Sequence, residues 1–218
     1  MKKVLAFGLA FVLLVNAHAQ SEKYVKAMEK LMPSVDTLWD GDKLKELSNS
    51  FERIAEAEKT QWLPYYYAAL TRVNAGYALA MNGGSMGGNA SVTDPEADKA
   101  EALLNKADAL SPDNSEIYIV KKLIATLRLL GNPMSRAMTY GPIAAEALEK
   151  ARTLDPNNPR VYLQQGLDKM NTPEEWGGSV VEGKKILEDA VKKFEAFKPL
   201  SSIHPNWGLA TARYFLAR

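Results

Sequence analysis

The sequence predicts an all-α fold in which about four pairs of helices stack side by side and a C-terminal helix caps the stack. Three observations support this prediction: a segment recurs within the chain, its apolar residues have helical spacing, and a Pro-Asn turn follows each copy. The stretch AEALLNKADALSPDNSEIY (100–118) aligns without gaps with AAEALEKARTLDPNNPRVY (144–162), at a constant offset of 144 − 100 = 44 residues. A repeat of this length indicates stacked supersecondary units.

The repeated segment has the pattern of a helix with one closely packed face. A small residue, a large apolar residue four positions later and an alanine three further on lie on the same side of a helix. The small residues let a neighbouring helix approach closely, and the large residue fills the space between them. This spacing occurs at Ala100, Leu104 and Ala107, at Ala144, Leu148 and Ala151, at Gly183, Leu187 and Ala190, and more weakly at Ser50, Ile54 and Ala57.

The turns and helix starts follow from proline, asparagine and capping residues. In both copies a proline that cannot continue the helix is followed by an asparagine, Asn114 or Asn158, that caps the next helix. Two capping boxes, TDPE at 93–96 and SVVE at 179–182, predict the starts of two further helices. Helices are expected at 22–38, 43–59, 62–81, 95–110, 115–130, 143–154, 159–170, 180–197 and 207–217.

These positions and spacings resemble the second helix of a tetratricopeptide repeat. Tyr118 and Tyr162 lie where that family has an aromatic residue in its first helix, and Gly166 lies where it has a small one. Lys121 and Lys122 depart from the family, which has apolar and small residues there. The resemblance implies a right-handed α-solenoid whose first helices line a concave face, and a non-catalytic scaffold that binds a peptide or protein. Fragments such as TPEEWGG and HPNWG are also similar to a group of exported bacterial repeat proteins.

The N-terminus has the three parts of a secretory signal peptide. Two lysines precede an apolar stretch at 4–15, and small residues occupy positions 17 and 19, which a signal peptidase reads. Cleavage is expected to remove residues 1–19 and to leave 20–218 as one helical repeat domain in the periplasm or outside the cell. The apolar stretch is too short to span a bilayer, which needs roughly 20 residues. No later stretch predicts a membrane span, and no cysteine follows the cleavage point to carry a lipid anchor.

Composition excludes several functional classes. Loss of the two N-terminal lysines leaves 25 basic residues against 26 acidic ones, so the chain lacks the basic field that nucleic-acid binding requires. The chain has no cysteine, and His204, in the turn sequence SSIHPNWG, is the single histidine that cleavage leaves. A cysteine nucleophile and a structural zinc site are therefore excluded, and we predict no catalytic residue, metal site or cofactor. A hydrolase or transferase would have to depend on His204 or on carboxylates.

Three connections within helical pairs are longer than the repeat requires. The surplus residues fall at 81–94, 131–142 and 171–179, and equivalent turns of a solenoid lie along one edge. We therefore expect three inserted loops side by side, on an edge that can bind a partner. The first loop contains MNGGSMGGNAS (81–91), but it has neither the lysine nor the preceding strand of a phosphate-binding loop.

Five side chains are candidates for partner binding. Arg136, Tyr140 and Trp176 lie on the expected loop edge, and arginine and aromatic residues dominate binding hot spots. Tyr65 and Arg72 lie on a first helix, which the resemblance places on the concave face. The alternatives are that Tyr140 and Trp176 cover helix ends, and that the tyrosines of WLPYYYAALTRVNAGYALAM pack in the core.

Two further possibilities for the ligand stay open. The preferred function is an exported scaffold that binds a protein or peptide at the cell envelope. The alternative is a solute-binding or solute-handing protein whose three loops form the site. Thioethers suit Cu(I) as well as adaptable apolar surfaces, and five methionines fall in or beside the expected loops: Met81, Met86, Met134, Met138 and Met170.

Overall fold

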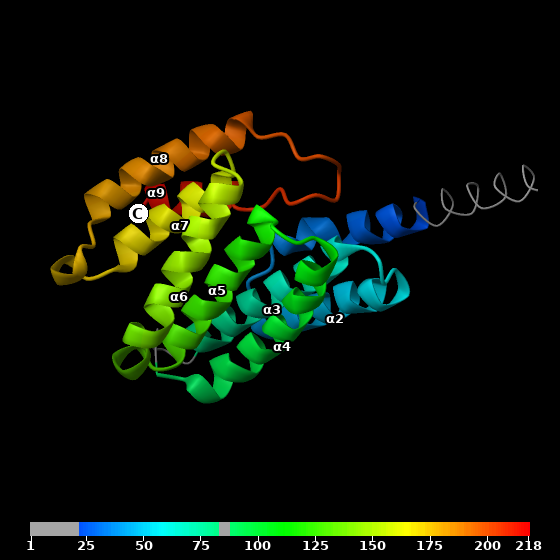
Figure 1. The fold of residues 1–218 in the computed structure, drawn as a ribbon, viewed down its shortest axis with the longest axis horizontal. Coiled ribbons are helices and arrows are strands. Elements are labelled where there is room, and N and C mark those ends of the chain that lie inside the picture. Colours follow the sequence, from blue (N-terminus) through cyan, green and yellow to red (C-terminus); the bar gives the residue numbers. More distant parts are fainter. Residues whose placement is uncertain (1–21, 83–87) are drawn as a thin grey trace, which may run out of the picture.

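A computed structural model describes residues 22–82 and 88–218, and every regular element within them is helical (Figure 1). The predicted all-α fold is confirmed, whereas the expected signal peptide at 1–19 lies outside the described residues. After a helical segment at 22–35, the elements are α2 (Gly41–Ala57), α3 (Trp62–Asn82), α4 (Ala90–Leu110), α5 (Ser115–Gly131), α6 (Pro133–Leu154), α7 (Pro159–Asn171), the short 3-10 helix η1 (Glu174–Trp176), α8 (Val180–Ala196) and α9 (Leu209–Leu216).

Helices that follow one another in the chain mostly pack against one another. Each helix from α2 to α6 packs on the next, and α7, α8 and α9 form a second such series. Between the two series, α7 makes few contacts with either α6 or α5, and the Glu116–Arg160 ion pair joins α5 to α7; α5 also contacts α3. Figure 1 shows the resulting row of helices, with α2 at one end and α7 and α8 at the other.

The apolar faces of these helices form one large core and one small one. The large core runs from the helical segment at 22–35 to α7, and the small core holds α7, α8 and α9 together. A Cβ built on Gly166 of α7 would lie 2.6 Å from Leu187 Cδ2 of α8, so any larger residue would require Leu187 to shift. The nine residues of the strong repeat pattern are all buried: Ala100, Leu104, Ala107, Ala144, Leu148, Ala151, Gly183, Leu187 and Ala190.

Three of the expected helix caps are present. The side chain of Asn114 accepts a hydrogen bond from the backbone N–H of Glu116, and that of Asn158 accepts one from Arg160. Ser179 accepts from the N–H of Glu182, as its capping-box position requires. These caps satisfy backbone donors that the first turn of a helix leaves free.

The predicted start of α4 is wrong. The helix begins at Ala90 rather than at 95, and Thr93 lies buried inside it with a hydroxyl that has no hydrogen-bond partner. Pro95 is therefore inside the helix, where its missing N–H costs one backbone hydrogen bond. The extension is held by packing, because Gly131 at the end of α5 lies against Ala90 and Thr93.

The predicted loop at 131–142 is also wrong, because α6 begins at Pro133 rather than at 143. Asn132 caps the helix by accepting from the N–H of Ser135, and proline fits the first position of a helix. Two hydrogen bonds from Arg136 to Asp94 then tie the added turns of α6 to α4. The surplus residues of this pair lengthen a helix. Of the loop expected at 81–94, residues 83–87 lie outside the described part of the chain.

The segment between α8 and α9, residues 197–208, crosses the molecule and is here named the C-terminal strap. It runs from α8 to the N-terminal helical segment and returns towards α9 (Figure 1). Ser202 Oγ donates to Glu29 at 2.7 Å, and Trp207 Nε1 donates to the Tyr66 hydroxyl at 2.8 Å. The strap therefore connects α8 and α9 to the helical segment at 22–35 and to α3.

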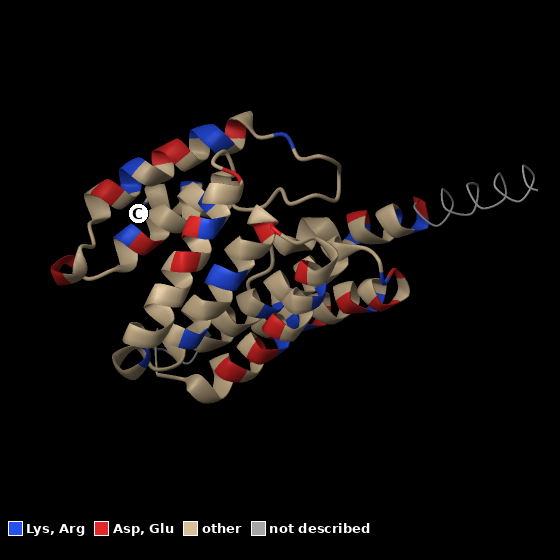
Figure 2. Ribbon diagram, in the orientation of Figure 1, with Lys and Arg blue, Asp and Glu red and all other residues tan. Residues whose placement is uncertain are grey.

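Charged side chains of both signs are interspersed along the helices (Figure 2). Many are paired between helices, as in Lys99–Glu52 at 2.6 Å and Lys106–Glu56 at 2.7 Å across α4 and α2. No helix in the described residues is long and apolar enough to cross a bilayer.

Candidate functional site

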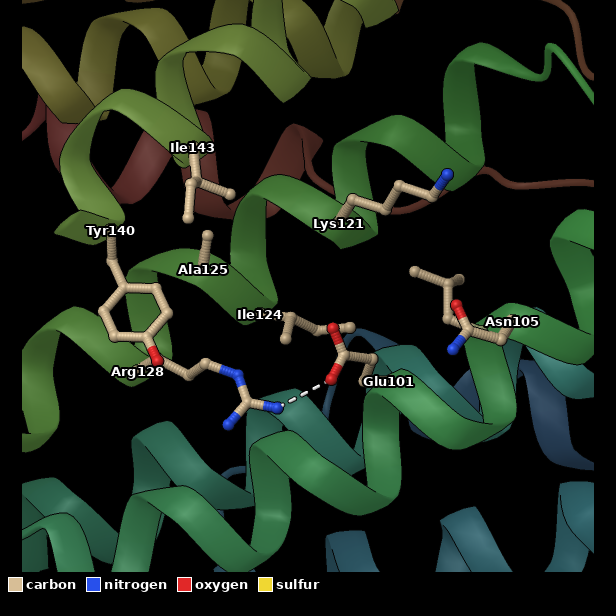
Figure 3. Close-up of a pocket in the computed structure, with 9 residues that line it drawn as sticks. Glu101, Asn105, Lys121, Ile124, Ala125, Arg128, Tyr140 and Ile143 are labelled. Carbon is tan, nitrogen blue, oxygen red and sulfur yellow. Dashed lines mark hydrogen bonds and ion pairs between the residues drawn. The ribbon is translucent and has the colours of Figure 1, made fainter.

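The candidate site is a groove of about 220 Å³ between α4 and α6, with α5 as its floor (Figure 3). Each helix contributes side chains at helical spacing, so one stripe of each faces the groove. Glu101, Leu104 and Asn105 come from α4, Tyr140 and Ile143 come from α6, and α5 contributes Lys121, Ile124, Ala125 and Arg128.

The middle of the groove is apolar. Leu104, Ile124 and Ala125 are buried and form its base, whereas the side chain of Ile143 remains 47% exposed on one wall. Tyr140 is half-buried and lies beside Ile143 at the α6 wall (Figure 3). The groove therefore offers an apolar surface and a phenol to a ligand with a flat apolar body.

Two cations border this apolar surface. Arg128 pairs with Asp98 at 2.7 Å and with Glu101 at 2.8 Å, and Lys121 pairs with Asp108 at 2.7 Å. The side chain of Arg128 is only 16% exposed, while those of Asp98 and Glu101 are 67% and 55% exposed. The carboxylates that hold Arg128 are largely solvated, whereas Lys121 lies between Asp108 and the ring of Tyr118, 4.2 Å from the ring centroid.

The charge of Arg128 is secure despite its partial burial. Burial alone would lower the pKa of its guanidinium, but hydrogen bonding to Asp98 and attraction by Glu101 outweigh burial and raise the pKa. The residues that line the groove include these two cations and one carboxylate, Glu101, while the partners Asp98 and Asp108 lie outside the lining. An anionic ligand would bind here by replacing these carboxylates as the partners of Arg128 and Lys121.

The structure brings one of the predicted site residues, Tyr140, into this groove. Arg136 lies nearby but is committed to Asp94 and to the carbonyl oxygen of Arg128, which its Nη1 reaches at 3.0 Å. Trp176 is 69% exposed on η1 and does not line the groove.

The other two predicted site residues, Tyr65 and Arg72, lie on α3, against which α2 and α4 pack. Tyr65 is buried and donates a hydrogen bond to Glu56, and Arg72 pairs with Glu96 of α4 at 3.1 Å. Arg72 also donates to Asn49 of α2 at 2.8 Å. Partner binding by these two residues stays a prediction, and in this structure their polar atoms are engaged within the fold.

Sequence reasoning did not select Lys121, Arg128 or Ile143. A signal for them exists in the sequence, because Lys121 occupies a position that the tetratricopeptide pattern makes apolar, and Arg128 follows it by seven residues on the same helical face. Only the packing of α6 beside α4 shows that the two cations border a groove.

A buried charge network fastens the repeats to one another. Glu116 of α5 and Arg160 of α7 occupy equivalent positions in the two repeat copies, and they pair at 3.0 Å. Arg160 is fully buried, and its guanidinium lies 5.0 Å from the ring of Phe197 and 5.4 Å from that of Trp207. Its second terminal nitrogen donates to the carbonyl oxygen of Pro205, so the network also holds the C-terminal strap.

The other side chains considered for catalysis or metal binding are His204, the carboxylates and the methionines. His204 lies in a turn, where it contacts Ser201 Oγ at 2.7 Å and the ring of Trp62, and burial lowers its pKa. The described residues contain no group of three histidine or carboxylate side chains able to hold a metal ion. Of the loop methionines, Met134 and Met138 are 95% and 89% exposed, and copper binding by the methionines stays untested.

Comparison with known proteins gives one informative likeness. No protein-family model matches the chain, and no curated protein matches it. A solved structure, the HusA haemophore from Porphyromonas gingivalis, is similar to the chain over 88% of its length and 90% of the haemophore. The two share 30% sequence identity, and the TM-score is 0.76.

Proposed function

Because the chain belongs to the family of the HusA haemophore, we propose that it is a non-catalytic, exported binding protein for haem or a related tetrapyrrole. We place the ligand in the groove between α4, α5 and α6. The observation that carries this placement is the combination, within one groove, of an apolar stripe, two cations and a tyrosine.

The groove matches the chemistry of the ligand part by part. A porphyrin has a flat apolar body, which Ile143 and Ile124 can contact, and two carboxylates, which Lys121 and Arg128 can pair with. Haem iron is held in proteins by histidine, cysteine, methionine or tyrosine. Of the residues that line the groove, Tyr140 alone belongs to this set. A groove of this size covers part of a porphyrin, so the rest of the ring would remain at the surface.

Charge distinguishes this groove from another cavity in the described part of the chain. That cavity, of about 320 Å³, lies beneath the C-terminal strap and is lined by Glu29 and Asp36 with no cation. The carboxylates of a porphyrin would be repelled there. The larger volume therefore does not make it the better tetrapyrrole site.

A haemin titration tests the proposal. The purified protein should bind haemin, with a change in the visible spectrum, and should also bind iron-free protoporphyrin. Tyr140→Phe should alter the haemin spectrum and weaken haemin binding but leave the affinity for protoporphyrin unchanged, because only the iron contact is lost.

Ile143→Glu places a carboxylate in the apolar stripe and should weaken both ligands by about tenfold or more through like-charge repulsion. Tyr214→Phe is the matched control, because Tyr214 is half-exposed on α9, away from the groove. Unchanged affinities in Ile143→Glu would place the ligand elsewhere, and an unchanged spectrum in Tyr140→Phe would exclude tyrosine as the iron ligand.

The proposal also includes a tetratricopeptide-like arrangement of the helices and export of the chain from the cytoplasm. The pairs α3–α4, α5–α6 and α7–α8, and the contacts of α5 with α3 and α7, support a right-handed, tetratricopeptide-like solenoid. The N-terminal sequence supports cleavage after residue 19 and a periplasmic or secreted location.

A protein or peptide partner at the cell envelope is the second candidate. Trp176 on η1 and Met134 and Met138 in the first turns of α6 are exposed. The start of α6 and the α7–α8 connection lie on the same side of the molecule (Figure 1). Large exposed apolar side chains of this kind mark interaction surfaces. A partner that is retained by the wild-type chain but lost from Trp176→Ala, with haemin affinity unchanged, would support this function.

A further inference from the structure

The first turns of α6 have little apolar packing to hold them in place. Arg136 is the one charged residue between positions 133 and 145, and Met134 and Met138 on the outer face are almost fully exposed. The buried residues of α6 begin only at Ala144. A helical segment with few buried apolar contacts opens easily, so the position of these turns depends on other interactions.

Arg136 fastens these turns to two neighbouring helices. Its two terminal nitrogens donate to the two carboxylate oxygens of Asp94 on α4, at 2.6 Å and 2.9 Å. The Nη1 atom also donates to the carbonyl oxygen of Arg128 on α5, at 3.0 Å. A bidentate pair between a guanidinium and a carboxylate fixes orientation as well as position. We name these three hydrogen bonds the Arg136 clamp.

The contact with α5 completes the end of that helix. The backbone N–H of Asn132 bonds to the carbonyl oxygen of Leu129, so the carbonyl oxygen of Arg128 lacks the donor that a further helical turn would supply. Arg136 supplies that donor. The guanidinium also packs closely on Gly131, where a Cβ would lie 2.6 Å from Nη1. The clamp is therefore fitted to the backbone of α5 and is more than a surface ion pair.

Tyr140 follows Arg136 by four residues and so lies next to it along one side of α6. The two side chains interact electrostatically: hydrogen bonding to Asp94 raises the pKa of the Arg136 guanidinium against the effect of burial, and attraction by Asp94 and Tyr140 adds to the rise. Tyr140 and Arg128 line the groove from α6 and α5 (Figure 3). The clamp thus connects these two helices one turn away from the phenol.

We propose that Arg136 is a positioning residue for the tetrapyrrole site and holds Tyr140 where its phenol oxygen can reach the iron. The proposal rests on the proposed function of the groove. Arg136 does not line the groove, so it acts through Tyr140. A clamp that only stabilised the fold would affect haemin and iron-free protoporphyrin alike. A positioning clamp affects haemin more, because only haemin uses the phenol oxygen.

Hydrogen exchange of the ligand-free protein tests the positioning. Backbone amides within 137–143 should exchange at least roughly threefold faster in Arg136→Met than in the wild type, because the clamp no longer opposes local opening. Lys169→Met is the matched control. Lys169 also pairs with a residue of the next helix, Glu182 at 2.8 Å, and also donates to a backbone carbonyl oxygen, that of Gly177. It lies outside the groove, so its loss should leave exchange at 137–143 unchanged.

Titrations with haemin and protoporphyrin test the link to Tyr140. Arg136→Met should change the visible spectrum of bound haemin and weaken haemin at least roughly threefold more than protoporphyrin. In the Tyr140→Phe background the same substitution should leave the ratio of the two affinities unchanged, because the contact that Arg136 positions is already lost. Asp94→Asn removes the charge on the other side of the clamp and should act in the same direction, so it serves as a second variant if Arg136→Met fails to fold.

The outcomes separate this role from the proposed function. Exchange at 137–143 like that of the wild type, equal weakening of both ligands, or an unchanged haemin spectrum would overturn the role of Arg136 alone, provided that Tyr140→Phe alters the spectrum. If the wild type does not bind haemin, or if Tyr140→Phe leaves the spectrum unchanged, iron ligation by Tyr140 fails and the role of Arg136 fails with it.

Discussion

Replacement of Arg160 by methionine should destabilise the protein more than any surface substitution. Arg160 is surrounded by protein: its side chain has 0% solvent exposure, and that of its partner Glu116 has 14%. Methionine keeps most of the apolar volume but leaves the Glu116 carboxylate buried without a cation. Breaking a buried pair in this way costs about 3–5 kcal/mol, and in a chain of this size each kcal/mol lowers Tm by about 2–4 °C.

Urea denaturation followed by circular dichroism measures this loss. The double variant Arg160→Met/Glu116→Gln should recover part of it, because glutamine removes the buried charge and can still accept a hydrogen bond from Asn158 or Tyr66. Arg152→Met is the control, since the Arg152–Glu149 pair is exposed and its loss should be hard to detect. A single variant as stable as the wild type, or a double variant less stable than the single one, would refute this interpretation of the network.

The same variant predicts a dependence on pH. Burial raises the pKa of Glu116 above its ordinary value of 4.5, and attraction by Arg160 opposes this rise. A raised pKa in the folded state means that the stability contributed by the protonated carboxyl is lost as pH rises through that pKa. Without the attraction of Arg160 the pKa of Glu116 rises further, so ionisation of Glu116 destabilises the folded variant more than the wild type. The difference in unfolding free energy between wild type and Arg160→Met should therefore narrow as pH falls towards 4.5.

Two further substitutions test the packing that positions the groove. Arg136→Met should cost about 1 kcal/mol at neutral pH. Hydrogen bonds from Arg136 lower the pKa of Asp94, so this difference should disappear as pH falls below the ordinary value of 3.8, and a difference that persists in acid would contradict the ion-pair explanation. Gly166→Ala should cost about 1–3 kcal/mol, because the new Cβ would overlap Leu187. Gly141→Ala, with nothing within 4 Å of the new Cβ, should be neutral or stabilising in the same unfolding assay.

Helical spacing and capping residues were sufficient to predict most of the fold. The pattern of small and large residues located the helices, and Asn114, Asn158 and Ser179 marked three of their starts. The sequence failed at the starts of α4 and α6, because a proline usually marks the first turn of a helix and here lies inside two of them. Contacts between the two helices, such as Arg136 with Asp94, stabilise the extra turns.

The site was less accessible to sequence reasoning than the fold. Tyr140 was selected because it is an aromatic residue near an expected loop, but it lies on a helix and contributes to a groove between three helices. The C-terminal strap has no periodic pattern, so its sequence gives no indication that Trp207 reaches Tyr66 or that Pro205 reaches Arg160. Both cavities are formed by segments that are distant in the sequence, and their contacts depend on tertiary packing.

The most direct test of the central proposal is an NMR titration with gallium protoporphyrin, a diamagnetic substitute for haem. Backbone and side-chain signals of 101–105, 121–128 and 140–143 should shift together and saturate at one ligand per chain. Shifts concentrated at 29–36 and 202–207, or spread over the surface without saturation, would contradict a tetrapyrrole site between α4, α5 and α6.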